Sequence, residues 1–396
     1  MKTRRNLKVI GALAAGSILL SACGGGDDAA DADSDEPIRI GAIMDQSGAT
    51  GDVGAPYSEG LVAYVDYINE NGGIEGREID ADVNDYAYEI PQAEDLYRRY
   101  VNDGVVAVMG WGTGDTEALR TRVANDELPF ISGSFSEELA DVEESPYNFL
   151  IAPTYSDQMR VALNWVAEEE GEATVAVLHN DSPFGTAPVA DGQEWIDEQG
   201  LDIEYSSHAI PSGTTNFTGL LNQVSSADYI VVQDVAAPCS QLARDIASQG
   251  SDQTIIGLNW CSSELFVTSA GDAAEGHMMI QPVAPLSAEV PGHEPIVEYL
   301  EEQGSDPDEQ VVSYVQGWYA MHIMAEGIRH TLEEGNDLTG ANIRESLETM
   351  GPIDTGGVIG DGEVEFDAES HRGSIASGIY VVEDGEITEL EAGVQP

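Results

Sequence analysis

Along the chain, short apolar runs alternate with segments whose apolar residues recur every three or four positions, as in strands followed by helices. In the first series, residues 38–44 form a strand-like run, and Leu61, Val65 and Ile68 then mark one face of a helix. The strands expected here cover residues 38–44, 79–83, 105–109 and 128–131, and the helices cover 61–68, 91–103 and 115–124. Residues 147–152 are expected to cross to a second unit.

A second series of the same kind begins at residue 174. Its expected strands cover residues 174–178, 203–206, 229–232, 254–257 and 278–280, with helices at 187–199, at 217–224 and between the strands at 229 and 254. Beyond residue 285, helices are expected at 296–302, 313–332 and 339–349, and short hairpin-like strands at 364–366 and 379–382. Two consecutive strand–helix series predict an α/β protein with two doubly wound, Rossmann-like lobes.

The first 36 residues depart from this pattern. A basic start is followed by an apolar run at 9–20, which is shorter than the roughly 20 residues of a membrane span and typical of a signal peptide. The run ends in Leu20-Ser21-Ala22-Cys23, which resembles a lipobox. We predict a signal peptide over residues 1–22, lipidation of Cys23 and a lipid-anchored acidic linker over 23–36. The protein is then exported and anchored to the outer face of the cell membrane.

Two points about this segment stay open. An ordinary cleavage site beside a chance cysteine is the alternative to the lipobox. Residues 3–7 also resemble a twin-arginine export signal, and the general secretory route is the other possibility.

The chain is strongly acidic, and this restricts the partners that it can bind by charge. The chain has 15 Lys+Arg against 73 Asp+Glu and a net charge of −58, and from Cys23 onward 11 Arg and no Lys give 11 − 73 = −62. Such a chain is not expected to bind nucleic acid or an anionic lipid surface by charge. Because 42% of residues are hydrophobic, the chain is not a disordered acidic tail. We interpret the charge as halophilic, suited to saline surroundings, with cation binding as the alternative.

Two cysteines remain beyond Cys23. Cys239 and Cys261 each follow a strand-like run, with one helix between the two runs. Neighbouring parallel strands would bring both loops to one edge of a sheet, so we predict a disulfide, with two separate buried thiols as the alternative. No His or Cys lies at zinc spacing, and neither a metal site nor a cofactor is predicted.

In doubly wound sheets, ligands bind beyond the carboxyl ends of the strands. The loop 110–116 offers Trp111, Thr113, Gly114 and Asp115 at the start of a helix, where free N–H groups suit a carboxylate or phosphate. Asp115 occupies the last position of a G-x-G-x-x-G pattern and would repel a pyrophosphate, which argues against a dinucleotide. A capped turn without ligand is the structural alternative.

Other candidate ligand-binding residues follow later strands. They are Ser134, Phe135, Ser136, Phe184, Asp234, Asn259 and Trp260. Rings, hydroxyls and a few acids suit a small, partly apolar solute, although helix capping explains the serines equally well. No G-x-S-x-G, H-E-x-x-H or P-loop motif occurs, so no catalytic residue is assigned and the protein is not expected to be an enzyme.

Three segments carry a family resemblance. Residues 41–54 with Ser47-Gly48, the run Ile68-Asn69-Glu70-Asn71-Gly72-Gly73-Ile74-Glu75-Gly76-Arg77 and residues 101–105 resemble the periplasmic binding proteins of the leucine/isoleucine/valine type, the solute receptors of ABC importers. The resemblance covers residues 38–382 and implies a type I periplasmic-binding fold. We expect lobe 1 to comprise 37–153 and 283–355 and lobe 2 to comprise 154–282 and 356–396, with a hinge that closes on the ligand.

The resemblance also implies a site. The loops that hold the carboxylate and amine of an amino acid match residues 111–116 and 134–136, and the second lobe's Tyr-Gly matches Phe184-Gly185. The family's acidic amine partner falls near Asn259 or Trp260, and Asp115, Asp181 or Asp234 could replace it.

The implied function is that of a monomeric, lipid-anchored receptor. It would capture a branched-chain or hydrophobic amino acid, or a related small carboxylate or amide, and deliver it to the permease and ATPase subunits of an ABC importer. A ligand-sensing receptor domain, and a receptor for an aromatic acid, urea or another amide, are the alternatives.

Overall fold

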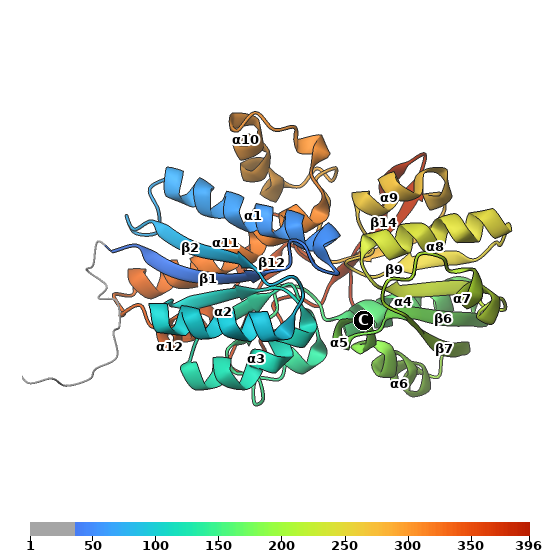
Figure 1. Cartoon of the computed structure of the whole chain (residues 1–396), viewed down its shortest axis with the longest axis horizontal. Coiled ribbons are helices and arrows are strands. Elements are labelled where there is room, and N and C mark those ends of the chain that lie inside the picture. Colours follow the sequence, from blue (N-terminus) through green and yellow to red (C-terminus); the bar gives the residue numbers. More distant parts are fainter. Residues whose placement is uncertain (1–35) are drawn as a thin grey trace, which may run out of the picture.

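The computed structural model describes residues 36–396, which form two α/β lobes side by side (Figure 1). The predicted fold class, two doubly wound lobes, is confirmed. The expected signal peptide, lipidation of Cys23 and all but the last residue of the acidic linker lie outside the described residues. Within residues 36–396, no helix combines the length and the apolar character needed to cross a membrane.

The first lobe is built on a parallel five-stranded sheet of order β2-β1-β3-β4-β5. Its strands are β1 (Ile38–Met44), β2 (Ile79–Asp85), β3 (Ala107–Gly110), β4 (Phe130–Ser132) and β5 (Asn148–Phe149). Its helices are α1 (Gly51–Glu70), α2 (Ile90–Asp103), α3 (Thr113–Asp126), α10 (Glu294–Glu302), α11 (Val312–Glu333) and α12 (Gly340–Thr349). In Figure 1, α1 lies on one side of the sheet and α2 and α3 lie on the other.

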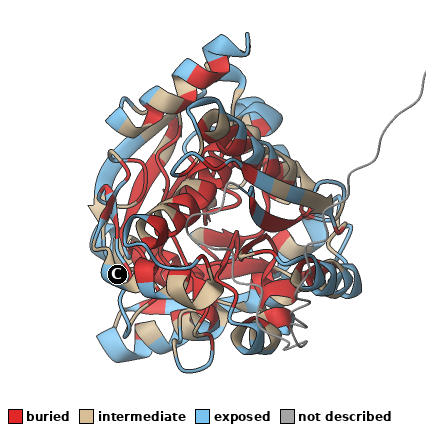
Figure 2. Ribbon diagram, turned by 90° about the vertical axis from the view of Figure 1, so that its left-hand side faces the viewer, coloured by how far each residue is buried: buried red, intermediate tan, exposed pale blue. Residues whose placement is uncertain are grey.

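The second lobe has a seven-stranded sheet of order β14-β13-β10-β9-β8-β6-β7, in which only β13 and β14 run antiparallel to their neighbours. Its strands are β6 (Ala173–Asn180), β7 (Ile203–Ile210), β8 (Tyr229–Gln233), β9 (Thr254–Gly257), β10 (Met278–Gln281), β13 (Ser377–Glu383) and β14 (Glu386–Val394). Its helices are α4 (Tyr155–Glu170), α5 (Pro183–Thr186), α6 (Val189–Gln199), α7 (Thr218–Gln223), α8 (Ala236–Gln249) and α9 (Glu264–Ala270). Figure 2 shows buried positions gathered inside the layers and exposed positions along the outer helix faces.

Three crossing segments join the lobes and lie side by side. The first and third are bonded where Leu150 N donates to His371 O at 2.9 Å and Gly373 N donates to Leu150 O at 2.7 Å. The second meets the segment before the third where Ala284 N donates to Val358 O at 2.8 Å. The first contact is a parallel bridge and the second an antiparallel one, so the segments that link the lobes are hydrogen-bonded to one another.

Residues after α12 stay with the first lobe longer than expected. The short strands β11 (Ile353–Asp354) and β12 (Glu363–Val364) pair antiparallel, and Phe366 lies 5.1 Å from Phe149 of β5 between ring centroids. His371 stacks on the same ring at 4.0 Å. The predicted boundary at 355/356 differs from this arrangement, because Val364 and Phe366 find their apolar neighbours in the first-lobe core.

A cluster of buried carboxamides fixes the hinge. Gln316 of α11 donates from Nε2 to Asn259 Oδ1 at 2.6 Å and to Gln281 Oε1 at 3.2 Å. Gln281 donates in turn to the carbonyl of Asn259 at 3.1 Å. Gln158 of α4 accepts from Asn259 N at 3.0 Å and donates to Pro153 O at 3.0 Å. These side chains tie α11 of the first lobe to three segments of the second.

Helices α1 and α11 pack backbone against backbone. A Cβ atom built on Gly60 would lie 1.9 Å from Tyr314 O, and one built on Gly317 would lie 1.9 Å from Tyr57 O. Only glycine therefore allows this approach, which brings Tyr57 within 5.0 Å of Trp111, measured between ring centroids.

Gly60→Ala is expected to lower the free energy of unfolding by roughly 1–3 kcal/mol, because the methyl group forces the two helices apart. Urea unfolding measures the change. Gly219→Ala in α7 is the matched control, since nothing lies within 4 Å of its Cβ position, and it should stabilise the protein by up to about 1 kcal/mol. Equal effects of the two substitutions would contradict the close contact.

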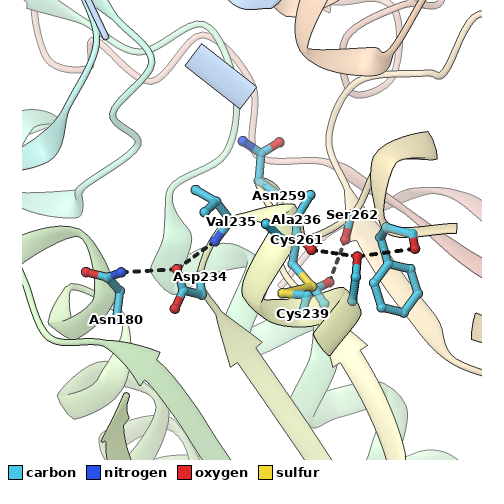
Figure 3. Close-up of a disulfide and its surroundings, with 12 residues drawn as sticks. Asn180, Asp234, Val235, Ala236, Cys239, Asn259, Cys261 and Ser262 are labelled. Carbon is cyan, nitrogen blue, oxygen red and sulfur yellow. Dashed lines mark hydrogen bonds between the residues drawn. A yellow bond between two sulfur atoms is a disulfide. The ribbon is translucent and has the colours of Figure 1, made fainter. Parts of the chain in front are cut away.

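Cys239 and Cys261 form a disulfide, with their Cα atoms 5.9 Å apart (Figure 3). Cys239 lies in the first turn of α8 after β8, and Cys261 follows β9, the parallel neighbour of β8. The bond closes a loop over 22 residues of sequence beside the interlobe face.

Replacing both cysteines by alanine is expected to remove roughly 3 kcal/mol of stability, because the unfolded chain regains the entropy of the open loop. The readout is urea unfolding with and without dithiothreitol. Reductant should destabilise the wild type by a similar amount and leave the double variant unchanged; a variant that still responds to reductant would refute this assignment.

Candidate functional site

A small cavity lies between the lobes, beyond the carboxyl ends of the strands. It is lined by Thr50, Tyr88, Trp111, Gly112, Thr113, Gly133, Tyr155, Phe184, Val235 and Trp260. Half of these residues are aromatic, and no lining residue in the described chain is Lys, Arg or His. The space open to the centre of a water-sized sphere is about 10 Å³, which is roughly enough for one water molecule. The walls therefore nearly touch.

The first-lobe wall is fixed from beneath by a buried carboxylate. Asp45, directly after β1, accepts hydrogen bonds from Thr50 N at 2.9 Å and from Thr50 Oγ1 at 2.7 Å. Thr50 Oγ1 accepts in turn from Trp111 Nε1 at 2.8 Å. This chain of bonds holds the indole of Trp111 in one orientation over the cavity.

Hydroxyl groups stand at the start of α3. Thr113 Oγ1 and Ser134 Oγ lie 2.8 Å apart in a buried hydrogen bond. Tyr155, the first residue of α4, donates from its hydroxyl to Gly133 O at 3.2 Å and accepts from Trp260 Nε1 at 2.9 Å. Tyr155 thus connects the two walls.

The second-lobe wall consists of rings backed by polar loops. Phe184 lies 5.4 Å from Tyr155, and Trp260 lies 4.6 Å from Trp111 across the lobe interface, both between ring centroids. Asp234, at the end of β8, accepts from Asn180 Nδ2 at 3.1 Å and from Val235 N at 2.8 Å, as Figure 3 shows. These bonds set the path of the loop that brings Val235 to the cavity.

The lobes also meet through a carboxylate. Asp52 in the first turn of α1 accepts from Ala237 N, near the start of α8, at 2.9 Å. Burial raises the pKa of Asp52, and this hydrogen bond opposes the rise. The contact closes one side of the interface when the lobes are together.

Asp115 is buried beneath the loop rather than in the wall. Tyr86 OH donates to its Oδ1 at 2.6 Å, while Oδ2 has no hydrogen-bond partner among the described residues. Burial raises the pKa of Asp115 to about 7, against the lowering effect of the Tyr86 hydrogen bond. Burial likewise raises the pKa of Asp234 to about 6. Both carboxyl groups therefore take up protons close to neutral pH.

The structure separates the predicted site residues into two groups. Trp111, Thr113, Phe184 and Trp260 line the cavity. The others are not among its lining residues: Gly114, Asp115, Ser134, Phe135, Ser136, Asp234 and Asn259.

The second group has identifiable places. Phe135 stacks on Trp260 at 6.1 Å from outside the cavity, and Ser136 Oγ donates to Glu117 at 3.0 Å. Asn259 belongs to the hinge carboxamides described above. Gly114 faces Pro183: a Cβ atom built on Gly114 would lie 3.6 Å from Pro183 Cγ. These residues support the lining ones.

Six lining residues were not among the predicted ones: Thr50, Tyr88, Gly112, Gly133, Tyr155 and Val235. Gly112, Gly133 and Val235 lie in loops already singled out, and Thr50 lies in the motif at 41–54, so neighbouring positions carried a signal. No signal in the sequence pointed to Tyr88. It follows Ala87, and both have positive φ, 59° and 51°, a backbone strain that concentrates at functional sites.

No group of three or more His, Cys, Asp or Glu side chains within residues 36–396 is arranged to hold a metal ion. The chemistry of the wall is that of rings, hydroxyls and backbone groups, which binds a small solute by shape and hydrogen bonding.

Two doubly wound lobes that enclose a cavity at their strand ends define a binding protein of the bilobed type. A sequence profile described as periplasmic binding protein matches residues 37–386, and the chain belongs to that family. The predicted resemblance is confirmed. Members of the family are extracytoplasmic solute-binding proteins of transporters, not enzymes.

The chain is similar to the Leucine-, isoleucine-, valine-, threonine-, and alanine-binding protein of Pseudomonas aeruginosa, with 22% identity over 74% of this chain and 78% of the relative. A branched chain amino acid ABC transporter structure from Thermus thermophilus with bound valine aligns with a TM-score of 0.86 and 24% identity, over 91% of this chain and 97% of that one. A substrate binding protein of an ABC transporter from Aeropyrum pernix aligns with a TM-score of 0.82 and 26% identity, over 91% and 96%.

Asp115→Asn is expected to change how stability depends on pH. Because the folded-state pKa of Asp115 is raised to about 7, its protonation stabilises the wild type at low pH, and this contribution is lost as pH rises through 7. Between pH 5 and pH 8 the variant should gain about 3 kcal/mol relative to the wild type.

Urea unfolding in 1 M salt at both pH values gives this difference. Asp252→Asn, which removes an exposed carboxyl group, should follow the wild type. A constant gap between Asp115→Asn and the wild type across pH would contradict the assignment.

Proposed function

We propose that this chain captures a small, partly apolar solute between its lobes and delivers it to an ABC permease with its ATPase. The solute class is a branched-chain or hydrophobic amino acid, or a related small carboxylate or amide. The observation that carries the proposal is the cavity itself, where Trp111 of one lobe meets Trp260 of the other at 4.6 Å over the start of α3.

The carboxylate or amide end of the solute binds at the first lobe. Helix α3 has 14 residues, and its first N–H groups lack intrahelical partners, which favours a negative or dipolar oxygen. The hydroxyl of the lining residue Thr113 lies beside it and, while Ser134 supports it, forms a hydrogen bond to the solute. No basic side chain is needed for such an end.

The apolar end of the solute packs against the rings from both lobes. Trp111, Tyr155, Phe184 and Trp260 contribute four of the ten lining residues and exclude water from the closed cavity. This lining also suits an aromatic acid, which is the second candidate.

Uptake requires the lobes to separate and close again. The contacts that part on opening are Asp52 with Ala237 N, Tyr155 OH with Gly133 O, and the two indoles. Closure around the solute then creates the surface that the permease distinguishes from the open form. The names of the relatives, which bind leucine, isoleucine and valine, support the solute class.

The proposal includes the cellular setting. A lipid on Cys23 would hold the receptor at the outer face of the membrane beside its permease, with the acidic linker 23–36 as tether. The protein acts as a monomer, and its surface charge suits a saline medium.

A thermal-unfolding screen tests the function. Valine, leucine, isoleucine, small amides, urea and aromatic acids are added to the full-length chain in high salt, and a true ligand at 100 times its Kd should add about 2.7 kcal/mol of stability. Thr113→Val should weaken the hit about tenfold or more by titration calorimetry, because a hydrogen bond to a charged end is lost.

The exposed Thr349→Val is the matched control and should bind like the wild type. A screen without any hit, or a hit whose affinity ignores Thr113→Val, would refute the proposed site.

A further inference from the structure

We propose that the cationic end of the solute is a methylated, quaternary ammonium group held by the aromatic rings, so that the ligand is a small betaine-type zwitterion. This inference rests on the proposed function and names the chemistry of one end of its ligand. The other end remains the carboxylate that meets the start of α3.

The rings provide the first argument. Five of the lining residues are aromatic: Tyr88, Trp111, Tyr155, Phe184 and Trp260. They come from both lobes, so closure surrounds a solute with ring faces and edges on several sides. A cation within about 6 Å of a ring centroid is attracted to the face of that ring, and tryptophan is the best partner. A trimethylammonium group presents methyl surface to the rings and needs no hydrogen bond.

The hydrogen-bond acceptors provide the second argument. The hydroxyl of Thr50 accepts from Trp111 Nε1 and donates to Asp45, and the hydroxyl of Tyr155 accepts from Trp260 Nε1 and donates to Gly133 O. A primary ammonium group carries N–H donors that each need an acceptor when buried. These two hydroxyls are already engaged in holding the indoles in place, and Thr113 Oγ1, which is bonded to Ser134, lies at the carboxylate end of the site. The ring end of the cavity therefore favours a cation without N–H groups.

The charges provide the third argument. Asp52, bonded to Ala237 N, and Asp234, bonded to the N–H of the lining residue Val235, lie near the cavity, and neither takes part in the ion pairs formed within residues 36–396. Asp115 lies behind Gly112, whose added Cβ would lie 2.3 Å from Oδ1, so it does not contact the solute. When Asp52 and Asp234 are ionised, their negative field stabilises a positive group among the rings.

The cavity must widen to take such a group. Trp111 and Trp260 stand 4.6 Å apart between ring centroids, so the two rings must separate before a cation fits between them within about 6 Å of each. Because the two indoles belong to different lobes, an opening at the hinge separates them without changing either hydrogen bond that orients them.

An isosteric pair of ligands tests the inference on the wild-type protein. N,N,N-trimethylglycine and 3,3-dimethylbutanoate have the same shape and differ by a quaternary nitrogen in place of carbon. In 1 M salt, where the Debye length is about 3 Å, titration calorimetry of the full-length chain should give about thirtyfold tighter binding of trimethylglycine. Equal binding, or tighter binding of the carbon compound, would overturn the inference.

A conservative variant separates ring chemistry from packing. Trp260→Phe should weaken trimethylglycine at least about fivefold and change 3,3-dimethylbutanoate far less, because the benzene ring attracts cations less than indole does. Trp165→Phe, whose ring contacts Tyr229 away from the cavity at 5.9 Å, should leave both affinities unchanged. Equal losses for the two ligands would also overturn the inference.

Valine in the same titrations separates this inference from the proposed function. If valine or another member of the screen binds and trimethylglycine does not, the inference fails and the proposed function stands. If no solute binds, both fail.

Discussion

The arrangement of the two lobes depends on a few buried carboxamides. Gln316 belongs to the long helix α11 of the first lobe, and it is hydrogen-bonded to Asn259 and Gln281 of the second. A buried amide that loses its hydrogen-bond partner costs free energy. Because these amides are bonded to one another, a shift of the lobes that breaks one of the bonds is disfavoured. Since every wall of the cavity comes from one lobe or the other, this polar contact sets the register in which the rings face each other.

The cavity follows from that register. The first lobe supplies a fixed indole, oriented through Thr50 by the carboxylate of Asp45, and the second supplies Trp260, oriented by Tyr155. Each indole N–H is used internally, so both rings are held as rigid surfaces rather than as donors. The cavity therefore presents rings that are preset by the protein, with hydroxyls and a helix start at one end.

Sequence patterns predicted the parallel strands well, because β-branched runs buried on both faces of a sheet carry a strong local signal. They missed α4 and β14, where polar or acidic residues obscure the periodicity, and α9, which has only seven residues. β14 is also largely exposed. The loops around Trp111, Phe184 and Trp260 could be predicted from the sequence, because each follows a strand and the carboxyl ends of parallel strands meet at one edge of a sheet. Tyr88 and Tyr155 could not be found this way, since their place in the wall depends on a strained backbone and on a crossing segment. The amide of Asn259 lies in the hinge because of tertiary partners remote in sequence.

The glycine contact between α1 and α11 bears on the order in which the chain acquires its structure. Gly60 and Gly317 lie 257 residues apart, yet their helices share one interface of the first lobe. The five parallel strands of the second lobe, by contrast, come from one uninterrupted stretch between Ala173 and Gln281. Contacts close in sequence form sooner than distant ones. A chain that emerges from its N-terminus therefore reaches a complete set of parallel strands in the second lobe while the first still waits for α11.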